Sequence, residues 1–196
     1  MPRMRSARHE DAEVLARLTE MAGHGLPFHL WAEAAAAGET PLDVGRSRLE
    51  GEEGNFSYRN AWVIEVGGAV AAGLIGYRQP EPYSLDGIDT FPPVLQPLVR
   101  LEALAPGSWY VNVLAVLPEH RGKGLGSLLL ADAERRAHEV GARSLSLIVA
   151  SENPNALRLY ERVGYRALAR RPVVGFPWFH GGDWVLMTKP VETLAR

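Results

Sequence analysis

The spacing of apolar residues predicts two helices and a hairpin in the first part of the chain. Apolar residues recur at helical spacing over 10–22, and an alanine-rich stretch over 30–37 predicts a second helix. The apolar runs 62–66 and 69–77 flank the pair Gly67-Gly68. Because a Gly-Gly pair between apolar runs suits a two-residue turn, these runs predict an antiparallel hairpin.

The pattern becomes more regular from residue 109 onward. An apolar strand over 109–117 precedes an amphipathic helix that begins near Leu125 and ends at Gly141, and 145–149 predicts a buried strand. A further helix is predicted over 154–163, with Asn153 as its N-cap and proline at its first helical position. A strand, a helix and a strand in this order imply a parallel step, and hence a mixed α/β sheet.

Residues 79–108 interrupt this regularity with six prolines. We interpret the segment as an insertion, with a short helix over 94–104. Two roles stay open for it, covering a substrate pocket or connecting strands along the sheet edge. After the last helix, 184–189 predicts a final strand that pairs with 172–176 across a Gly181-Gly182 turn.

Composition limits the class of protein. With 196 residues, 46% of them hydrophobic, the chain can bury one sizeable core, so a single domain over 1–196 is expected. A formal net charge of −2 gives no reason to expect nucleic acid or an anionic membrane as a partner. The absence of cysteine excludes disulfides, a thiolate nucleophile and thiolate metal ligands. Charged residues follow the start in place of an apolar leader, so we expect a cytoplasmic protein.

The segment Arg121-Gly122-Lys123-Gly124-Leu125-Gly126 joins the 109–117 strand to the following helix. Three glycines at alternate positions let the backbone approach an anion, and the helix points its N–H groups and the positive end of its dipole at the same place. The segment therefore predicts a pyrophosphate site. A tight strand-to-helix turn without a ligand is the alternative.

Two other glycine-rich loops do not fit this segment. The dinucleotide pattern G-x-G-x-x-G requires a third glycine where the chain has Ser127 or Leu129, depending on where the pattern begins. A nucleotide P-loop requires Ser or Thr after Gly-Lys, but Gly124 follows Lys123. The remaining pattern is Arg-x-x-Gly-x-Gly.

This pattern, preceded by Val113-Leu114-Ala115-Val116, resembles the acyl-coenzyme A loop of the GNAT acetyltransferases. The run Asn153 to Tyr165 resembles the second signature of that family, with Ala156, Tyr160 and Gly164 at matching positions. The two signatures cover roughly 109 to 165. The resemblance implies an α/β fold with a mixed central sheet of about six to seven strands flanked by helices.

The resemblance also implies an activity, the transfer of an acetyl group from acetyl-CoA to a primary amine of a small molecule, peptide or protein. The amine would attack the thioester directly, in a ternary complex. A homodimer is common in such families. Tyr160 matches the general acid that protonates the departing thiolate, although a packing role is the alternative. The residues that match cofactor-binding positions are Leu114, Ala115 and Val116 through their main chain, Arg121, Gly122, Lys123, Gly124, Leu125, Gly126 and Ser127 in the loop, and Asn153 and Asn155 downstream.

The general base is not singled out by any spacing. Many family members place a carboxylate on the central strand, whereas this chain has Tyr110 and Asn112 there. Glu102, His120 and Glu65 are equal candidates, and a water chain is a further one. His29 and Glu33 are four residues apart, but no third ligand has metal-site spacing, so no metal is expected. A non-catalytic acyl-CoA sensor stays an alternative to the enzyme.

Overall fold

The computed structural model describes residues 1–175 and 181–192. These residues form two compact units, one made of 1–77 and 112–129 and the other of 78–111 and the described residues from 130 onward. The seven strands follow the hydrogen-bonded order β1-β2-β3-β4-β5-β7-β6. Strand β4 contributes residues to both units. The predicted mixed α/β sheet is confirmed, at the upper end of the expected number of strands.

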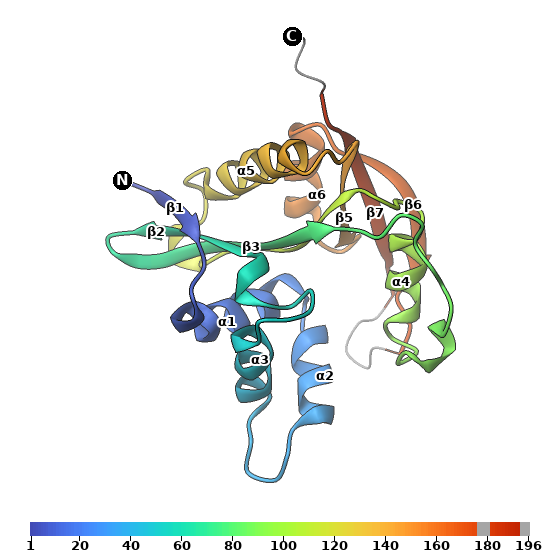
Figure 1. Ribbon diagram of the computed structural model, residues 1–196, viewed down its shortest axis with the longest axis horizontal. Helices are drawn as coiled ribbons and strands as arrows, with labels where there is room; N and C mark the ends of the chain where they lie inside the picture. Colours follow the sequence, from blue (N-terminus) through green and yellow to red (C-terminus); the bar gives the residue numbers. More distant parts are fainter. Residues whose placement is uncertain (176–180, 193–196) are drawn as a thin grey trace. The chain divides into compact units, whose positions relative to one another are not determined.

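The first unit holds three strands and part of a fourth, together with three helices and the beginning of a fourth helix (Figure 1). Its elements are β1 (Arg3–Ser6), α1 (Ala12–Ala22), α2 (Leu26–Ala34), α3 (Pro41–Glu50), β2 (Ala61–Val66), β3 (Ala69–Arg78), the second half of β4 (Trp109–Val116) and the start of α5 (Leu125–Glu139). The helices α1, α2 and α3 pack against one another, on one face of β1, β2 and β3.

The core of the first unit joins these helices to the strands. Leu15 of α1, Trp31 of α2 and Leu49 of α3 are buried together with Val63 of β2 and Ile75 of β3. The predicted hairpin is confirmed, since β2 and β3 pair antiparallel on either side of the Gly-Gly turn. Both turn glycines have positive φ, which side chains with a Cβ rarely adopt.

Close packing between α2 and α3 requires glycine at position 45. A Cβ at Gly45 would lie 2.6 Å from Cζ3 of Trp31, which is itself buried. Alanine is the better helix former by about 1 kcal/mol, but the overlap with a rigid indole costs about 1–3 kcal/mol. We therefore expect Gly45→Ala to lower the free energy of unfolding by about 1 kcal/mol in urea titrations, the middle of the range left by these two effects.

Ser47, which is exposed on α3, gives the matched control. Ser47→Ala introduces the same side chain in the same helix without a clash and is expected to be neutral or slightly stabilising. Equal unfolding free energies for the two variants would contradict the packing argument.

A bidentate ion pair ties β1 to the turn before α1. The Arg5 guanidinium donates to both carboxylate oxygens of Asp11 at 2.6 and 2.9 Å, and its Nε donates to Glu65 of β2 at 2.6 Å. The Asp11 carboxylate also accepts the backbone N–H of Arg8 at 2.7 Å. Burial raises the pKa of Asp11, but the hydrogen bonds from Arg5 and Arg8 outweigh this effect and hold the pKa below its usual value.

Because the pKa of Asp11 is lower in the folded state than in the unfolded chain, its contribution to stability is present above the unfolded pKa and is lost as pH falls through the folded pKa. We expect Asp11→Asn to lower the free energy of unfolding by about 3 kcal/mol at pH 7, and by less below about pH 4. Urea titrations at pH 7 and pH 3 measure the difference.

Glu13→Gln serves as the control for Asp11→Asn, since Glu13 and its partner Arg17 are largely exposed and their pair should be worth less than about 1 kcal/mol. If Asp11→Asn lowers the free energy of unfolding equally at both pH values, the ionised carboxylate of Asp11 is not the source of the stabilisation.

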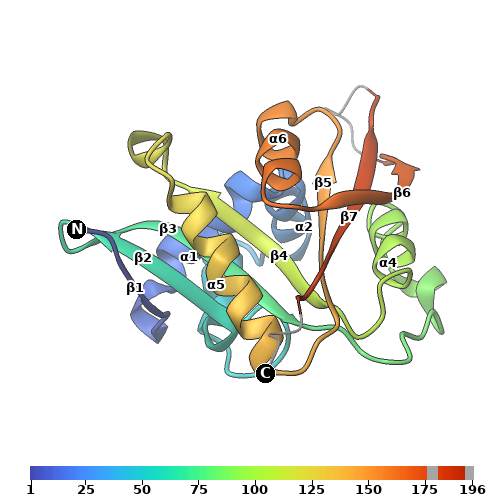
Figure 2. The same cartoon turned by 90° about the horizontal axis from the view of Figure 1, so that it is seen from above.

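The second unit contains four strands with helices on both faces (Figure 2). Its elements are α4 (Gln96–Glu102), the first half of β4, the remainder of α5, β5 (Ser144–Ala150), α6 (Pro154–Arg162), β6 (Arg166–Pro172) and β7 (Asp183–Pro190).

Short 3₁₀ turns occur in the chain at His9–Asp11, Tyr58–Asn60, Ile88–Thr90 and Pro118–His120.

The predicted parallel step is confirmed in this unit, where Trp109 of β4 pairs with Leu145 of β5. Strand β7 lies antiparallel between β5 and the edge strand β6. Buried hydroxyls join β5 to the residue before β4, since Ser108 Oγ lies 2.6 Å from Ser146 Oγ. The short helix expected within the insertion is present as α4, which packs against β5, β6 and β7.

Several expected elements need correction. The second helix begins at Leu26, not residue 30, because Gly25 at φ +89° and the following proline start it earlier. The strand expected over 172–176 is wrong: β6 ends at Pro172, which pairs with Asp183, and residue 176 lies outside the described residues. Strand β1, helix α3 and most of β6 were not expected. No helix among the described residues is long and apolar enough to cross a membrane.

Candidate active site

The loop after β4 is built by local hydrogen bonds within the first unit. Leu117 N–H donates to Ala71 O of β3 at 2.9 Å, and a 3₁₀ turn follows in which Arg121 N–H donates to Pro118 O at 3.2 Å. Gly122 and Gly124 then adopt φ of +73° and +78°, and α5 begins at Leu125. The glycines are required by these dihedral angles, which turn the chain from strand to helix.

The loop and the first turn of α5 present a row of unpaired backbone donors. Within the described part of the chain, no backbone carbonyl accepts from the N–H groups of 122–127, and the first paired donor is Leu128, to Gly124 O at 3.1 Å. A Cβ at Gly122 or Gly124 would meet no atom within 4 Å, so the space beside both residues is open. Unpaired donors, a helix dipole and open space together fit an anionic group such as a pyrophosphate.

The two cations of the loop fold back onto its backbone. Arg121 Nε donates to Val116 O at 3.2 Å, and Lys123 Nζ donates to Glu119 O at 2.9 Å. Both bonds are exposed, so a phosphate oxygen can replace the carbonyl at little cost. Leu125 is 2% exposed and anchors the start of α5 in the core, which is a structural role.

Strand β4 presents alternate residues to its two faces. Val113 and Ala115 are buried, whereas Asn112, Leu114 and Val116 are partly exposed on the other face. The Asn112 amide donates to the Tyr77 hydroxyl at 2.9 Å. No Asp or Glu occurs between Trp109 and Val116, so this strand carries no carboxylate.

The second signature contains the whole of α6 in the second unit. Asn153 Oδ1 accepts the N–H of Ala156 at 3.1 Å, which confirms the predicted N-cap. Asn155 is exposed, and its Oδ1 accepts from Arg158 at 2.5 Å. The two asparagines therefore differ: one shapes the helix start, and the other pairs with an exposed arginine.

Tyr160 lies in α6 and is 8% exposed. Burial raises the pKa of Tyr160 to about 12, so its phenol stays protonated throughout the physiological range. Its ring lies 5.9 Å from that of Tyr165, which is 1% exposed. The Tyr165 hydroxyl has no hydrogen-bond partner among the described residues. Tyr160, the position expected from the signature, therefore holds a protonated donor.

A carboxylate held by neutral donors lies elsewhere in the second unit. Glu102, at the last turn of α4, accepts hydrogen bonds at Oε2 from the Tyr83 hydroxyl at 2.8 Å and from the Gln79 amide at 3.2 Å. Tyr110 of β4 also hydrogen-bonds to this carboxyl group. Burial raises the pKa of Glu102 despite these three hydrogen bonds.

The other candidate bases are less suited to proton transfer. Glu65 is paired with Arg5, so its carboxylate serves the ion pair of the first unit. His120 precedes the glycine loop, and its Nδ1 is buried without a partner among the described residues. No cluster of three or more potential metal ligands occurs in the part of the chain that the structure describes. Trp178, Phe179 and His180, which could contribute to an aromatic pocket, lie outside the described residues.

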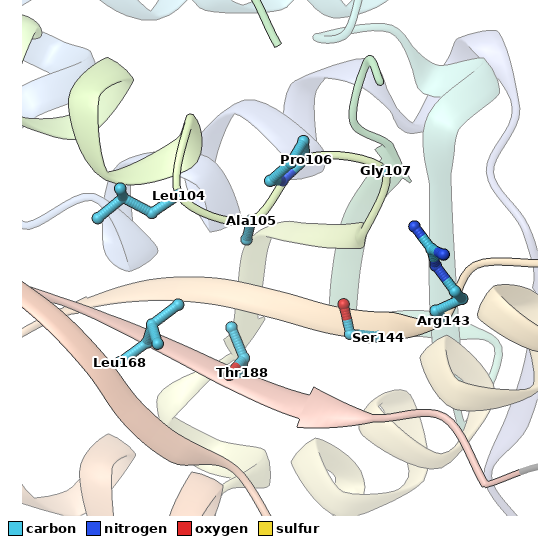
Figure 3. Close-up of a pocket in the computed structure, with 8 residues that line it drawn as sticks. All are labelled: Leu104, Ala105, Pro106, Gly107, Arg143, Ser144, Leu168 and Thr188. Carbon is cyan, nitrogen blue, oxygen red and sulfur yellow. The ribbon is translucent and has the colours of Figure 1, made fainter. Parts of the chain in front are cut away.

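A shallow cavity of about 280 Å³ in the second unit contains none of the expected site residues (Figure 3). Leu104 and Leu168 line one end of it, and Arg143 lies at the other end in this view, with Ser144 between them. Arg143 is largely exposed and pairs with Glu81 at 2.7 Å. The lining offers hydroxyls and apolar surface but no nucleophile paired with a base.

The chain matches the model of the acetyltransferase (GNAT) family over residues 27–165. The chain belongs to this family. The match includes the glycine loop and the second signature, and it ends at Tyr165. It also includes α3 and nearly all of α2, which lie outside the two signatures.

Two curated relatives each match part of this chain. An uncharacterized protein of Mycobacterium leprae, ML0378, is 33% identical over 145 residues, which cover 68% of this chain and 34% of that protein. The L-amino acid N-acyltransferase MnaT of Escherichia coli is 33% identical over 73 residues, 37% of this chain and 41% of that protein. This chain therefore spans about two fifths or less of the length of these relatives.

A solved structure supports the fold along the chain. The putative acetyltransferase yncA of Salmonella typhimurium, solved with acetyl-CoA, has a TM-score of 0.63 and 20% identity, with 100% of this chain and 97% of that chain covered. At this identity the likeness shows the GNAT fold.

Proposed function

We propose that the protein is an N-acetyltransferase that moves an acetyl group from acetyl-CoA to a primary amine by direct attack in a ternary complex. The observation that carries this proposal is the loop of 122–127, whose unpaired N–H groups face open space at the start of a 15-residue helix. Membership of the GNAT family and the acetyl-CoA bound to the Salmonella typhimurium structure support the choice of co-substrate.

Acetyl-CoA supplies a thioester whose carbonyl carbon an amine can attack. In our proposal the backbone of Gly122 to Ser127 binds the pyrophosphate, and Arg121 and Lys123 exchange their exposed backbone bonds for phosphate oxygens. The main chain of Leu114, Ala115 and Val116 binds the pantetheine arm and polarises the thioester carbonyl. One such donor is worth roughly 2.7–4 kcal/mol in acyl-transfer sites.

Tyr160 donates a hydrogen bond to the departing sulfur in this proposal. Its high pKa ensures that the hydroxyl carries its proton at neutral pH. Asn153 fixes the start of the helix that carries Tyr160, as its hydrogen bond to Ala156 supports. We retain Asn155 as a weaker cofactor contact, because its present partner is an exposed arginine.

The acceptor that we propose is a primary amine of a small molecule, peptide or protein. The name of the Escherichia coli relative, an L-amino acid N-acyltransferase, supports an α-amine as the first to try. A homodimer, a single domain and a cytoplasmic location stay predictions, and analytical ultracentrifugation tests the first of these.

Release of free coenzyme A thiol tests the proposed activity. Because the chain has no cysteine, every thiol that a disulfide reagent detects in the assay comes from the co-substrate. We expect amine-dependent thiol release with L-amino acids or simple alkylamines at millimolar concentration, and mass spectrometry should find the acetylated amine. Binding of acetyl-CoA without turnover of any amine would contradict the enzyme and favour a sensor.

The sensor is the second candidate because β4 carries no carboxylate to act as a base. A non-catalytic acyl-CoA module would keep the affinity of the glycine loop for acetyl-CoA and would release no thiol. Thiol release in the presence of an amine therefore separates the two candidates.

A further inference from the structure

Glu102 is a largely enclosed carboxylate whose hydrogen-bond partners are all neutral. Gln79 and Tyr83 lie before α4 in the chain, and Tyr110 lies after it in β4, so three separate segments converge on one side chain. Gln79 is 4% exposed and Tyr110 is also 4% exposed, which leaves these donors little freedom to move. The carboxylate is held in place by its surroundings.

Other carboxylates that are largely buried have a cationic partner, and Glu102 has none in the part of the chain that the structure describes. Asp11 pairs with Arg5 at 2.6 Å, and Asp132 pairs with Arg136 at 2.6 Å. Among the described residues, no lysine, arginine or histidine pairs with Glu102. Carboxylates that leave water are normally paired with a cation, because three neutral donors compensate only part of the lost hydration.

The hydrogen-bonding capacity of Glu102 is also incompletely used. A carboxylate accepts about four hydrogen bonds, and Glu102 accepts three. The bonds from Gln79 and Tyr83 both end on Oε2. Glu102 is partly exposed, so a small ligand can reach it. The missing partner is therefore a positively charged hydrogen-bond donor.

We propose that Glu102 binds the ammonium group of the acceptor amine, while Gln79, Tyr83 and Tyr110 hold its carboxylate in position. A primary ammonium group supplies both the missing charge and the missing donor. This inference rests on the proposed acetyltransferase activity for the identity of the ligand. In this proposal the acceptor is recognised by α4, the helix within the 79–108 insertion.

Carboxyl-carbon NMR tests the site without requiring turnover. Protein with ¹³C at the glutamate Cδ is titrated with n-butylammonium, with butyltrimethylammonium and n-butanol as probes that lack either the N–H donors or the charge. We expect a saturable shift of the Glu102 resonance with n-butylammonium and a much weaker response to the other two. Equal responses to all three probes, or no saturable shift, would overturn the proposal.

The resonance is assigned by its loss in Glu102→Gln. Tyr83→Phe, which removes one donor to the same carboxylate, should displace the same signal and gives an assignment that does not depend on the folding of Glu102→Gln. Glu81→Gln is the matched control from the same insertion, because Glu81 is exposed and is paired with Arg143. In Glu81→Gln the Glu102 resonance should still shift on titration with n-butylammonium.

Kinetics separate this inference from the proposed function. We expect Glu102→Gln to raise the KM for n-butylamine by about 10-fold or more and to leave the affinity for acetyl-CoA unchanged, with Glu81→Gln near the wild type. If the wild type turns over n-butylamine and Glu102→Gln has the same KM, the inference fails while the function stands. If the wild type binds no acetyl-CoA, the function fails, and the NMR titration still decides whether Glu102 binds ammonium.

Discussion

Replacing Gly124 with glutamate is expected to abolish the stabilisation of the protein by acetyl-CoA. The new carboxylate would stand among the N–H donors of 122–127, where it competes for them and repels the phosphates. Ligand at a hundred times its dissociation constant should stabilise the wild type by about 2.7 kcal/mol, a rise in melting temperature of roughly 5–10 °C. Thermal unfolding with and without acetyl-CoA measures both proteins.

The variant should fold, because a Cβ at Gly124 meets no protein atom within 4 Å. Its φ of +78° nevertheless imposes a cost of about 1 kcal/mol on any residue other than glycine. Gly38→Glu is the matched control, since Gly38 also has positive φ, is exposed and has no atom within 4 Å of the Cβ position. It imposes similar strain and the same charge between α2 and α3, and it should keep the response to acetyl-CoA.

If acetyl-CoA stabilises a folded Gly124→Glu protein as strongly as the wild type, the glycine loop is not part of the cofactor site. If acetyl-CoA does not stabilise the wild type, the acetyltransferase proposal itself is contradicted. The two results are distinct, because the first compares variants and the second concerns the wild type alone.

The parts of the structure that the sequence predicted well are those that local chemistry determines. Gly122 and Gly124 adopt positive φ, which a residue without a Cβ reaches readily, and the Asn153 cap depends only on the next few residues. The hairpin follows equally from its Gly-Gly turn. Each of these features is set within about ten residues of chain, so the sequence alone carries enough information.

Elements with weak local signals were missed. Helix α3 has only two fully buried apolar residues, Val44 and Leu49, and a glycine at its centre, which lowers its predicted helicity. Its reciprocal Thr40–Asp43 cap was a readable start signal. Strand β6 is exposed over nearly its whole length and carries arginines, so it lacks the alternation that identifies a strand.

The cluster around Glu102 shows why the acceptor side was harder to predict than the cofactor side. Its donors stand at 79, 83 and 110, and only the packing of α4 and β4 brings them to one carboxylate. No spacing in the sequence marks such a group.

Tyr160→Phe is expected to lower kcat by about 100-fold or more without weakening the binding of acetyl-CoA. The substitution removes only the hydroxyl, and the ring can keep its packing beside Tyr165. Stopped-flow or steady-state thiol release gives kcat, and thermal unfolding with acetyl-CoA gives the affinity. A variant with wild-type kcat would show that Tyr160 is a packing residue.

Tyr165→Phe is the matched control, because it removes a buried hydroxyl that has no hydrogen-bond partner among the described residues. Loss of an unpaired buried polar group should leave the stability unchanged or slightly higher, and kcat should stay near that of the wild type. A comparable loss of kcat in Tyr165→Phe would mean that the pair of rings, and not the Tyr160 hydroxyl, supports turnover.

The pH dependence of turnover provides an independent check on Tyr160. Burial raises its pKa to about 12 from a reference value of about 10, so the hydroxyl should keep its proton up to about pH 11. An acid must be protonated to act, and kcat should therefore show no alkaline decline due to Tyr160 up to pH 10. A decline centred near pH 10 in the wild type that is absent in Tyr160→Phe would place the hydroxyl in water, in contradiction to its burial in α6.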